Sequence, residues 1–379
     1  MRFTDLKLIQ PLLKALDKVG YEQPTPIQQQ AIPSVLEGKD LFGCAQTGTG
    51  KTAAFSLPIL QLLSLKNYSP TNKNTKVLIL APTRELAIQI SANIKEYSEN
   101  LNITHTTIFG GVSQVSQVRD LKKGVDILIA TPGRRMDLMQ QGFVHLNHIE
   151  FFVLDEADRM LDMGFINDVK KIIAKLPAKK QTLFFSATAA PDIMKLANTL
   201  LKNPVKVSVT PISTAAELVK QNVYYVSKED KRPLLRYIIK DSKIEHALVF
   251  TRTKRGADRV AKELNKNGIK AEAIHGDKSQ GARERALNGF KNRTIRILVA
   301  TDIASRGIDV DKLSHVINFE IPEVAETYVH RIGRTGRAGS SGIALSFCTK
   351  EELPYLRDIN KLIKKEIEAV IKHPFASVK

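Results

Sequence analysis

Residues 45–52 have the sequence Ala45-Gln46-Thr47-Gly48-Thr49-Gly50-Lys51-Thr52, and this stretch decides the fold that we expect. A short apolar run at 41–43 precedes it, and a helix-compatible run at 53–55 follows it. A glycine-rich loop of this kind between a strand and a helix is typical of phosphate-binding loops in parallel α/β folds. The backbone N–H groups of the loop and the positive end of the helix bind phosphate oxygens together.

The residues of the loop have separable roles. Gly48 and Gly50 permit the bends that turn backbone N–H groups inward. Lys51 brings a positive charge to the outer phosphates, and the Thr52 hydroxyl can bind Mg²⁺. Ala45 stands where the strict motif has glycine, so the stretch matches a variant of the motif. A Gly/Thr-rich turn before a helix is the alternative interpretation.

An acidic stretch, Asp155-Glu156-Ala157-Asp158, follows the apolar run 151–154. A carboxylate that ends a strand downstream of a phosphate loop can hold Mg²⁺, partly through water, and we assign this role to Asp155. Glu156 can orient and deprotonate a water that attacks the γ-phosphate. The alternative is a solvated acidic helix start, favoured by the helix dipole. The lysine of the upstream loop favours the nucleotide site.

Length and composition indicate a globular protein of two domains. A chain of 379 residues is long for a single core, and 43% of its residues are hydrophobic and 25% charged. No run is long and apolar enough to suggest a membrane span, and no signal-peptide pattern is recognisable, so we expect a cytoplasmic protein. Cys44 and Cys348 are far apart in sequence and are expected to be reduced thiols.

The net charge of +18 indicates a polyanionic partner. Both halves of the chain carry an excess of lysine and arginine. Because the chain has no tryptophan and only 6% aromatic residues, contacts with a nucleic-acid backbone fit better than extensive base stacking. A generally basic surface without a specific partner is the alternative.

Apolar runs alternate with helix-like segments along the chain, which predicts parallel sheets with helices on both faces. The pattern lapses around 209–219, which we interpret as a linker between domains at 1–208 and 220–379. Residues 353–379 are expected to form a final helix and a short tail. The expected strands are Val77–Ala81, Thr106–Phe109, Ile127–Ala130, Phe151–Leu154, Thr182–Ser186, Ala247–Thr251, Lys270–Ile274, Ile295–Ala300, His315–Phe319 and Ile343–Cys348.

Ligands of parallel sheets bind beyond the carboxyl ends of the strands, and polar residues follow several of these runs. Arg84, Gly111, Thr131 and Arg134 offer guanidinium, hydroxyl or backbone N–H groups suited to phosphodiesters, although helix caps and tight turns use the same residue types. The hydroxyls of Ser186 and Thr188 could bond to Asp158 and couple the nucleotide site to a neighbouring surface, or simply cap a helix.

Three arginines, Arg331, Arg334 and Arg337, lie within seven residues of the second half. If the segment is helical, Arg334 and Arg337 can point at one anion. Facing the first domain, they would stabilise charge on the transferred phosphoryl group. A plain basic patch for nucleic acid is the alternative. Asp302, at another strand end, could serve nucleotide and RNA contacts.

Gln28 follows two prolines, Pro24 and Pro26, which make the chain rigid there. Its side-chain amide carries a donor and an acceptor, so it can recognise an adenine edge. By spacing alone it is also an ordinary polar residue at a helix start, and its position upstream of the phosphate loop favours the first interpretation.

The order of these motifs resembles that of DEAD-box ATP-dependent RNA helicases of superfamily 2, over nearly the whole chain. Within that family the chain is most similar to compact bacterial members of the RhlE type. The resemblance implies two tandem RecA-like domains that close on ATP, Mg²⁺ and RNA. It also implies local unwinding of short RNA duplexes, or remodelling of RNA–protein complexes, by a monomer.

The resemblance assigns a role to each motif residue. Lys51, Asp155, Glu156, Arg334 and Arg337 are implied to be catalytic, with Thr52 and Asp155 at the metal. Asp158, Ser186, Thr188 and His330 are implied to couple the domains. Nucleotide contacts are implied for Phe3, Tyr21, Gln28, Thr47, Gly48, Thr49, Gly50, Lys51, Thr52 and Asp309, and contacts with the RNA backbone for Arg84, Gly111, Thr131, Arg134, Arg283 and Thr301.

One residue departs from the family pattern. Arg135 stands where the family usually has an apolar residue, and we expect it to leave catalysis unaffected but to alter the local RNA surface. Three other functions remain open: a DNA helicase or translocase, an ATP-gated RNA clamp that does not unwind, and a P-loop kinase or GTPase. Gln28 and the acidic tetrad argue against the first, intact Glu156 against the second, and the second domain against the third.

Overall fold

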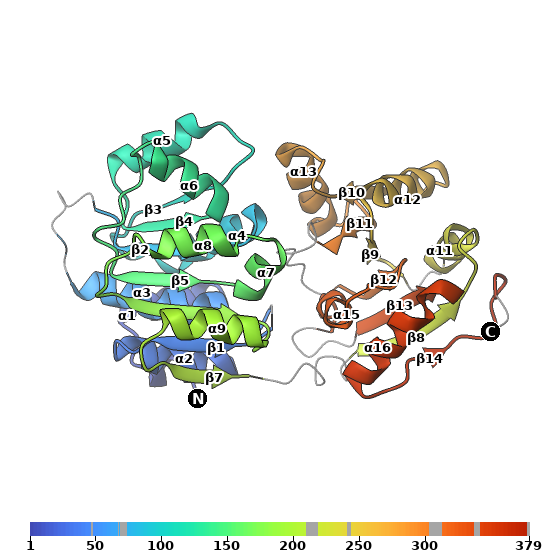
Figure 1. The fold of residues 1–379 in the computed structure, drawn as a ribbon, viewed down its shortest axis with the longest axis horizontal. Helices are drawn as coiled ribbons and strands as arrows, with labels where there is room; N and C mark the ends of the chain where they lie inside the picture. The colour runs from blue at the N-terminus through green and yellow to red at the C-terminus, as the bar shows by residue number, and fades with distance from the viewer. Residues whose placement is uncertain are drawn as a thin grey trace. The chain divides into compact units, whose positions relative to one another are not determined.

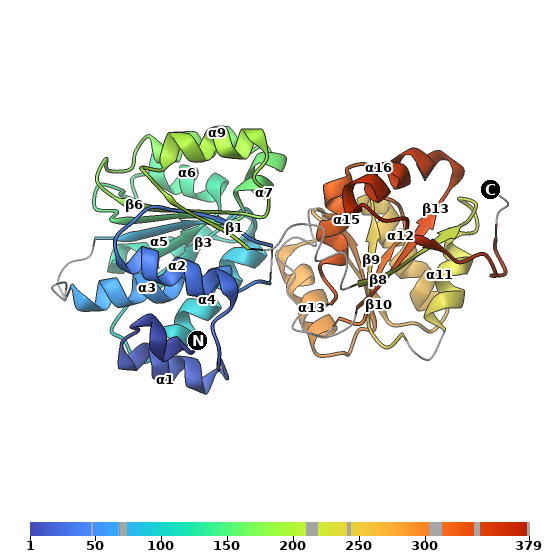
Figure 2. The same ribbon diagram turned by 90° about the horizontal axis from the view of Figure 1, so that it is seen from below.

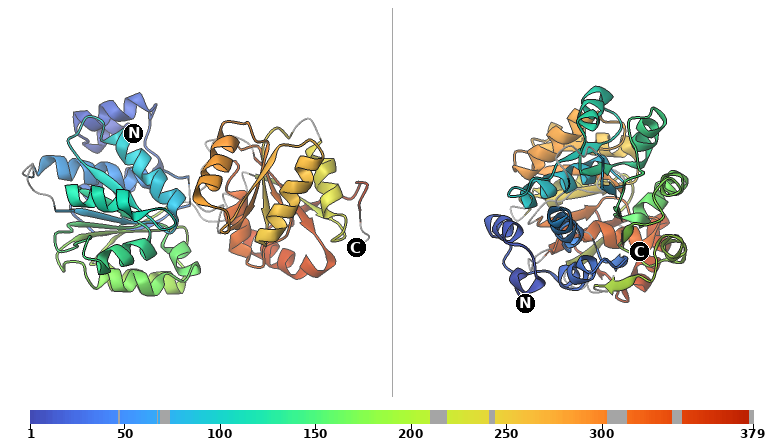
Figure 3. Two further views of the ribbon diagram at one scale, coloured as in Figure 1. Left: turned by 90° about the horizontal axis from the view of Figure 1, so that it is seen from above. Right: turned by 90° about the vertical axis from the view of Figure 1, so that its left-hand side faces the viewer.

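A computed structural model of the chain describes residues 1–46, 48–66, 68, 74–209, 219–240, 244–302, 313–336 and 342–376. The chain divides into two compact units, Met1–Val209 and Thr210–Lys379. Each unit is a parallel sheet between layers of helices, as Figure 1 and both views of Figure 3 show. The predicted class of two parallel α/β units is confirmed. No helix in these ranges is long and apolar enough to cross a membrane.

The first unit contains a seven-stranded sheet of order β3-β4-β2-β5-β6-β1-β7. Every pairing in it is parallel. Its elements are η1 (Phe3–Leu6), α1 (Gln10–Lys18), α2 (Pro26–Leu36), β1 (Leu41–Cys44), α3 (Lys51–Leu65), β2 (Val77–Leu80), α4 (Arg84–Tyr97), β3 (His105–Ile108), α5 (Gln114–Lys123), β4 (Ile127–Ala130), α6 (Pro132–Gln140), β5 (Phe151–Leu154), α7 (Ala157–Asp162), α8 (Ile166–Ile173), β6 (Gln181–Ser186), α9 (Pro191–Leu200) and β7 (Val205–Ser208).

The second unit repeats this design with a seven-stranded sheet of order β10-β11-β9-β12-β13-β8-β14, again parallel throughout. Its elements are β8 (Val219–Tyr225), α11 (Lys231–Ile239), β9 (Ala247–Thr251), α12 (Lys254–Lys266), β10 (Ala271–Ile274), α13 (Gln280–Lys291), β11 (Ile297–Thr301), β12 (His315–Asn318), α15 (Ala325–Ile332), β13 (Gly342–Cys348), η2 (Lys350–Glu352), α16 (Leu353–Ile363) and β14 (Glu368–Ala369).

Alternation along the strands separates the core of the first unit into two apolar layers. Val77 and Ile79 of β2 pack with helices α1–α4, whereas Leu78 and Leu80 pack with helices on the opposite face. Figure 2 shows α7 and α9 on one side of this sheet and α1–α3 on the other. Both faces are therefore covered, as near-continuous apolar strands require.

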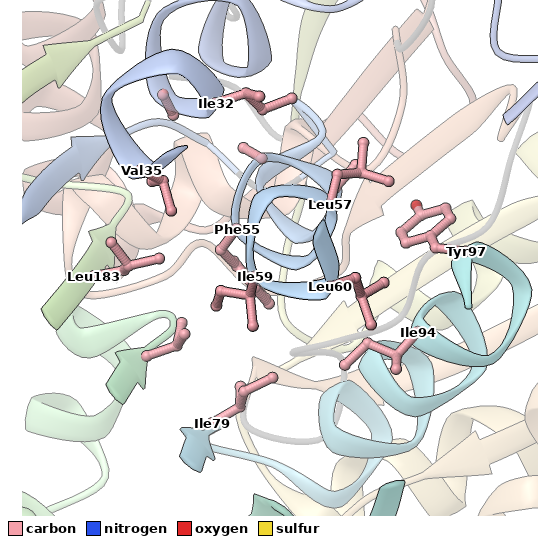
Figure 4. Close-up of a cluster of buried hydrophobic side chains, with 14 of the residues drawn as sticks. Ile32, Val35, Phe55, Leu57, Ile59, Leu60, Ile79, Ile94, Tyr97 and Leu183 are labelled. Carbon is pink, nitrogen blue, oxygen red and sulfur yellow. The ribbon is translucent and has the colours of Figure 1, made fainter. Parts of the chain in front are cut away.

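Helix α3, which follows the phosphate loop, is buried on nearly all sides. Its side chains pack against α2, α4 and the sheet, and Figure 4 shows Phe55, Leu57, Ile59 and Leu60 inside this cluster. A helix that is apolar all round is a core helix. The loop is thus attached to one of the most constrained elements of the unit.

The residues before Gly20 form the 3₁₀ turn η1 and the helix α1, because Lys7 adopts a left-handed conformation (φ 57°) and Pro11 favours a new helix start. One local expectation is wrong. The expected C-terminal tail contains β14, whose residue Ala369 pairs with Val223 of β8. Both cysteines are free, as expected.

Candidate nucleotide and RNA-backbone site

The strand order separates the candidate residues of the first unit into two neighbouring groups. Strands β5, β6 and β1 lie side by side, and they end at Asp155, Ser186 and the phosphate loop. Strands β3, β4 and β2 are likewise adjacent, and Gly111, Thr131 and Arg84 follow them. All strands are parallel, so both groups lie on the same edge of the sheet. One edge of the sheet therefore carries the residues assigned to the nucleotide next to those assigned to the RNA backbone.

The phosphate loop has the conformation expected of an anion cradle. Gly48 and Gly50 have φ values of 86° and 91°, which strongly favour glycine. Lys51 is buried, and its Nζ donates to the carbonyl oxygen of Ala45 at 2.6 Å. The Thr49 hydroxyl donates to the Gln46 carbonyl at 2.7 Å. Thr47 lies outside the described residues.

Gln28 connects the helix start of α2 with the loop. Its Oε1 accepts from the backbone N–H of Thr25 at 2.9 Å, and its Nε2 donates to the carbonyl oxygen of Gly50 at 3.1 Å. A Cβ on Gly50 would lie 2.4 Å from that Nε2, so the close approach requires glycine. The amide has a second lone pair and a second hydrogen, which recognition of an adenine edge would require, and that role stays a prediction.

Asp155 and Glu156 are almost completely buried, each with 2% of its surface exposed. Burial raises the pKa of Asp155, and the nearby Lys51 opposes that rise. Glu156 has a φ of 53°, a left-handed conformation that is uncommon for residues other than glycine and concentrates at functional sites. The two carboxyl groups thus occupy a constrained, low-dielectric position at the end of β5.

Arg159 was not predicted to be part of the site, and its Nη1 lies 2.6 Å from Oε2 of Glu156. Both side chains are buried, so the guanidinium compensates the charge of the carboxylate and orients it. The spacing in the sequence could have predicted this pair, because side chains three positions apart at the start of a helix lie close enough to form an ion pair.

Asp158 is also buried, and its Oδ2 accepts from the backbone N–H of Ala187 at 3.3 Å. The Ser186 hydroxyl accepts from the backbone N–H of Thr188, likewise at 3.3 Å. The ends of β5 and β6 are thus connected through a backbone amide, whereas the sequence analysis expected hydroxyl groups. Asp158 Oδ1 has no hydrogen-bond partner among the described residues.

The aromatic residues assigned to the nucleotide lie together. The rings of Phe3 and Tyr21 are stacked with centroids 6.3 Å apart, and the Tyr21 and Tyr97 hydroxyls are 3.3 Å apart. Phe3 is buried, whereas Tyr21 is 41% exposed. Tyr21 therefore presents the accessible ring face of this group.

On the backbone-binding half of the edge, Arg84 lies against Gly111. A Cβ on Gly111 would lie 2.2 Å from Nη1 of Arg84, and the φ of Gly111 is 76°. Thr83 caps α4, because its hydroxyl accepts from the backbone N–H of Leu86. These contacts bring together two residues that are 27 positions apart in sequence, as the RNA assignment requires.

Thr131 and Arg134 are at the start of α6, next to this pair. Thr131 is the N-cap residue, but its hydroxyl makes no capping hydrogen bond. Arg134 Nη2 donates to the carbonyl oxygen of Val112 at 3.1 Å, which connects α6 with the loop after Gly111. The four residues from three strand ends therefore form one surface.

Arg135 is not on that surface. Its side chain is completely buried, with 0% exposed, and burial lowers its pKa to about 9. Arg135 therefore contributes no exposed group to the RNA surface that it was expected to alter, because the third residue after the α6 start points into the core while Arg134 remains at the rim.

In the second unit, α15 ends at Ile332 and Gly333 is its C-cap residue. Arg334 therefore follows the helix, and the helical arrangement considered for Arg334 and Arg337 is wrong for the described part of the segment. Arg334 is 5% exposed, and its Nε donates to the His330 carbonyl oxygen at 3.4 Å. Arg337 and Asp309 lie outside the described residues.

Arg331 has a structural role. Its Nε and Nη2 donate to Asp302 at 2.6 and 2.8 Å, and its Nη1 donates to the carbonyl oxygen of Glu320 at 2.7 Å and to Oδ1 of Asn318 at 3.2 Å. The guanidinium is 1% exposed. It joins the carboxyl ends of β11 and β12 to α15. Both carboxylate oxygens of Asp302 accept hydrogen bonds from this guanidinium.

Arg331→Met is expected to lower the free energy of unfolding of the second unit by about 1–3 kcal/mol, because it removes the buried hydrogen bonds of the guanidinium to Asp302, Asn318 and the Glu320 carbonyl. Urea unfolding of the full chain, followed by circular dichroism, measures this loss. Adding Asp302→Leu should recover part of the lost stability, since the carboxylate that faced Arg331 is removed together with it. If Arg331→Met alone is as stable as the parent, Arg331 does not have this structural role.

The remaining candidates of the second unit are near strand and helix ends. Thr301 is the last residue of β11 and is 8% exposed. Arg283 lies in the first turn of α13, where Gln280 Nε2 donates to Glu284 Oε1 at 3.0 Å. These positions are compatible with backbone contacts, which stay a prediction.

Comparison with known proteins agrees with this geometry. Residues 25–196 match the family model described as DEAD/DEAH box helicase, and residues 230–339 match that of the helicase conserved C-terminal domain. The chain is 43% identical over 366 residues to the ATP-dependent RNA helicase CshA of Limosilactobacillus reuteri, covering 96% of this chain and 72% of that protein. It is 42% identical over 372 residues to the ATP-dependent RNA helicase RhlB of Pseudomonas syringae pv. tomato, covering 97% and 94%.

Among solved structures, S. cerevisiae Dbp5 bound to RNA and ADP BeF3 superposes with a TM-score of 0.86 at 30% identity, covering 97% of this chain and 95% of that chain. The predicted pair of RecA-like domains is confirmed by this likeness and by the two parallel sheets. The RhlE-type assignment stays a prediction. Together with the phosphate loop and the Asp-Glu-Ala-Asp stretch on one sheet edge, these similarities establish that the chain belongs to the family of DEAD-box ATP-dependent RNA helicases.

Proposed function

We propose that this chain is an RNA-stimulated ATPase that separates short RNA duplexes locally or remodels RNA–protein complexes. One observation carries the proposal: the phosphate loop with Asp155 and Glu156 lies on the same sheet edge as the surface of Arg84, Gly111 and Thr131. An ATP-hydrolysing site and a backbone-binding surface on adjacent strands can influence each other through the rigid sheet. The proposal includes a cytoplasmic location, where ATP and RNA are available.

The first unit fits ATP and Mg²⁺. Two glycines of the loop have positive φ values, and Lys51 already points to a carbonyl oxygen that a phosphate oxygen can replace. Mg²⁺ binds through one or two protein oxygens together with phosphates and water. Thr52 and Asp155 would hold it, and it would neutralise phosphate charge.

Catalysis by this chain depends on a single buried base. Glu156 is held by Arg159 and can accept the proton of a water directed at the γ-phosphate. Lys51 stabilises the charge that develops on the outer phosphates. We assign the coupling of this site to the neighbouring surface to Asp158, Ser186 and Thr188, since the Asp158–Ala187 hydrogen bond connects the two strand ends.

The second unit is proposed to complete the site during turnover. Arg334 and Arg337 would stabilise the transferred phosphoryl group, Asp309 would contact the ribose, and His330 would relay the state of one site to the other. Arg283 and Thr301 would extend the grip on RNA. Hydrolysis then depends on RNA, because RNA favours the state in which both units contribute residues.

RNA recognition is proposed to depend on the backbone and not on base sequence. The candidate groups are guanidinium groups, hydroxyls and backbone amides, which bind phosphates and sugars. Affinity should therefore fall steeply with salt concentration and vary little with sequence.

Gln28→Ala is expected to reduce the preference for ATP over GTP by about one order of magnitude, since paired hydrogen bonds to a base edge contribute ~1–3 kcal/mol. Competition binding of the two nucleotides measures the preference. Gln29→Ala is the matched control, because Gln29 is the next residue and its Nε2 donates to the Pro24 carbonyl oxygen at 2.8 Å and not to the phosphate loop as described. If the Gln28 variant keeps the preference for ATP over GTP, Gln28 does not recognise the base and serves the structure through its hydrogen bond to Gly50.

Strand separation tests the proposed activity. A short RNA duplex with a single-stranded overhang should separate with ATP and remain paired without it, whereas an all-DNA duplex of the same sequence should remain paired in both cases. Separation of the DNA duplex would favour a general translocase. Stable retention of RNA without separation would favour a clamp.

A further inference from the structure

Arg135 is the most unusual buried group in the first unit. It is one of two fully buried arginines among the described residues, and none of its Nε, Nη1 and Nη2 atoms has a hydrogen-bond partner there. A guanidinium has five N–H donors, and buried charges are normally paired. Its position is therefore unfavourable for the folded chain in isolation.

The location of Arg135 connects it with the RNA-backbone surface. It is the fourth residue of α6, and its backbone N–H donates to the carbonyl oxygen of Thr131, the N-cap residue. Helical side chains lean toward the N-terminus of their helix, so this charge is beneath the first turn. The positive end of the helix dipole is there as well. The Arg135 charge and the positive end of the helix dipole repel each other, which destabilises the folded chain. Both attract an anion to this end of α6.

The surface above it already has the groups that an anion requires. The Thr131 hydroxyl makes no capping bond, and the Arg134 side chain is only 13% exposed and contacts the loop after Gly111. Arg134 is partly balanced by Asp137, whose Oδ2 is 3.7 Å from its Nε. Arg135 has no such partner, so its field is available to a bound phosphate.

We propose that Arg135 acts from its buried position as an uncompensated positive charge that strengthens the binding of an RNA phosphate at the start of α6. This inference rests on the proposed RNA-binding function of that surface. The guanidinium does not touch the phosphate. A charge in a medium of low dielectric constant acts over a longer distance and is screened less by salt than one in water.

Replacing the charge tests the inference. Arg135→Met should weaken binding of single-stranded RNA roughly 10-fold, because it removes a buried positive charge whose attraction for a phosphate is little screened by water. The same variant should have a higher unfolding temperature, because an apolar side chain replaces an unpaired buried charge. Affinity and stability then change in opposite directions, which a loss of packing cannot produce.

Arg119→Met is the matched control. Its side chain is 70% exposed, so it removes the same formal charge from a screened position on α5, and RNA affinity should change less than about 2-fold. Raising the salt concentration should lower the affinity of every chain but preserve the ratio between the parent and Arg135→Met. If the methionine variant does not fold, Arg135→Gln removes the charge but keeps a polar side chain. The same loss of RNA affinity is expected for it.

The outcomes are distinguishable. If the parent itself does not bind RNA, the proposed function fails. If the parent binds and Arg135→Met binds equally well, or loses no more than Arg119→Met, then Arg135 is only a strained core residue and the inference is overturned.

Discussion

Glu156→Gln should bind ATP normally and hydrolyse it roughly 10²–10⁴-fold more slowly, the range expected for loss of a general base. Glutamine has the shape of glutamate and its Oε1 can still accept from Arg159, so the buried end of β5 should keep its structure. Asp155 and Lys51 are unchanged, which preserves the groups assigned to phosphate and metal. Steady-state hydrolysis and titration with a fluorescent ATP analogue measure the two properties separately.

The control for this variant is Glu99→Gln, the same chemical change at an exposed carboxylate that pairs with Lys18. It should hydrolyse ATP at the rate of the parent. Normal turnover by Glu156→Gln would remove Glu156 from the mechanism. A variant that fails to bind ATP would mean that the carboxylate supports the nucleotide site and not the attacking water.

Arg334→Ala should lower RNA-stimulated hydrolysis by about 10³-fold or more, because arginines that stabilise a transferred phosphoryl group contribute 10³–10⁵ in rate. Nucleotide binding should be retained, since the phosphate loop and Gln28 are in the other unit. The same two measurements with saturating single-stranded RNA test this expectation.

Arg293→Ala is the matched control, because Arg293 is an exposed arginine of the second unit that faces Glu245 at 3.8 Å. It should leave the stimulation intact. Retained stimulation in Arg334→Ala would mean that this arginine reaches no phosphate, and the basic-patch interpretation would then apply to it.

Most strands could be predicted because they are apolar runs that are buried on both faces. The run 127–130 of the first unit is β4 and the run 247–251 of the second is β9, with identical bounds. Strands β7, β8 and β14 were missed. Strand β7 is at the sheet edge and has an exposed lysine and serine, β8 contains the three consecutive polar residues Lys220, Gln221 and Asn222, and β14 has only two residues.

The nucleotide site was predictable because its chemistry requires particular residues in a short stretch. The groups that contact and orient the site residues were less predictable. Arg159 is near Glu156 in sequence but carries no motif, and the Gln28–Gly50 hydrogen bond depends on how α2 packs against α3. The order of the strands, which places the two groups of residues next to each other, arises from tertiary packing and leaves no local pattern in the sequence.

The arginines show the same limit most clearly. Arg331, Arg334 and Arg135 are equally basic in sequence, yet their surroundings differ. Arg331 is paired with Asp302, Arg334 follows a helix end, and Arg135 is buried with no hydrogen-bond partner in the part of the chain that the structure describes. Burial and partners, and not charge alone, decide which arginine stabilises the fold and which can act on an anion.

Steady-state ATP hydrolysis with single-stranded RNA, with single-stranded DNA and with neither is the most direct test of the central claim. We expect strong stimulation by RNA and little by DNA of the same sequence. Equal stimulation by DNA, or none by either nucleic acid, would contradict an ATPase whose turnover depends on RNA bound at the neighbouring edge of the sheet.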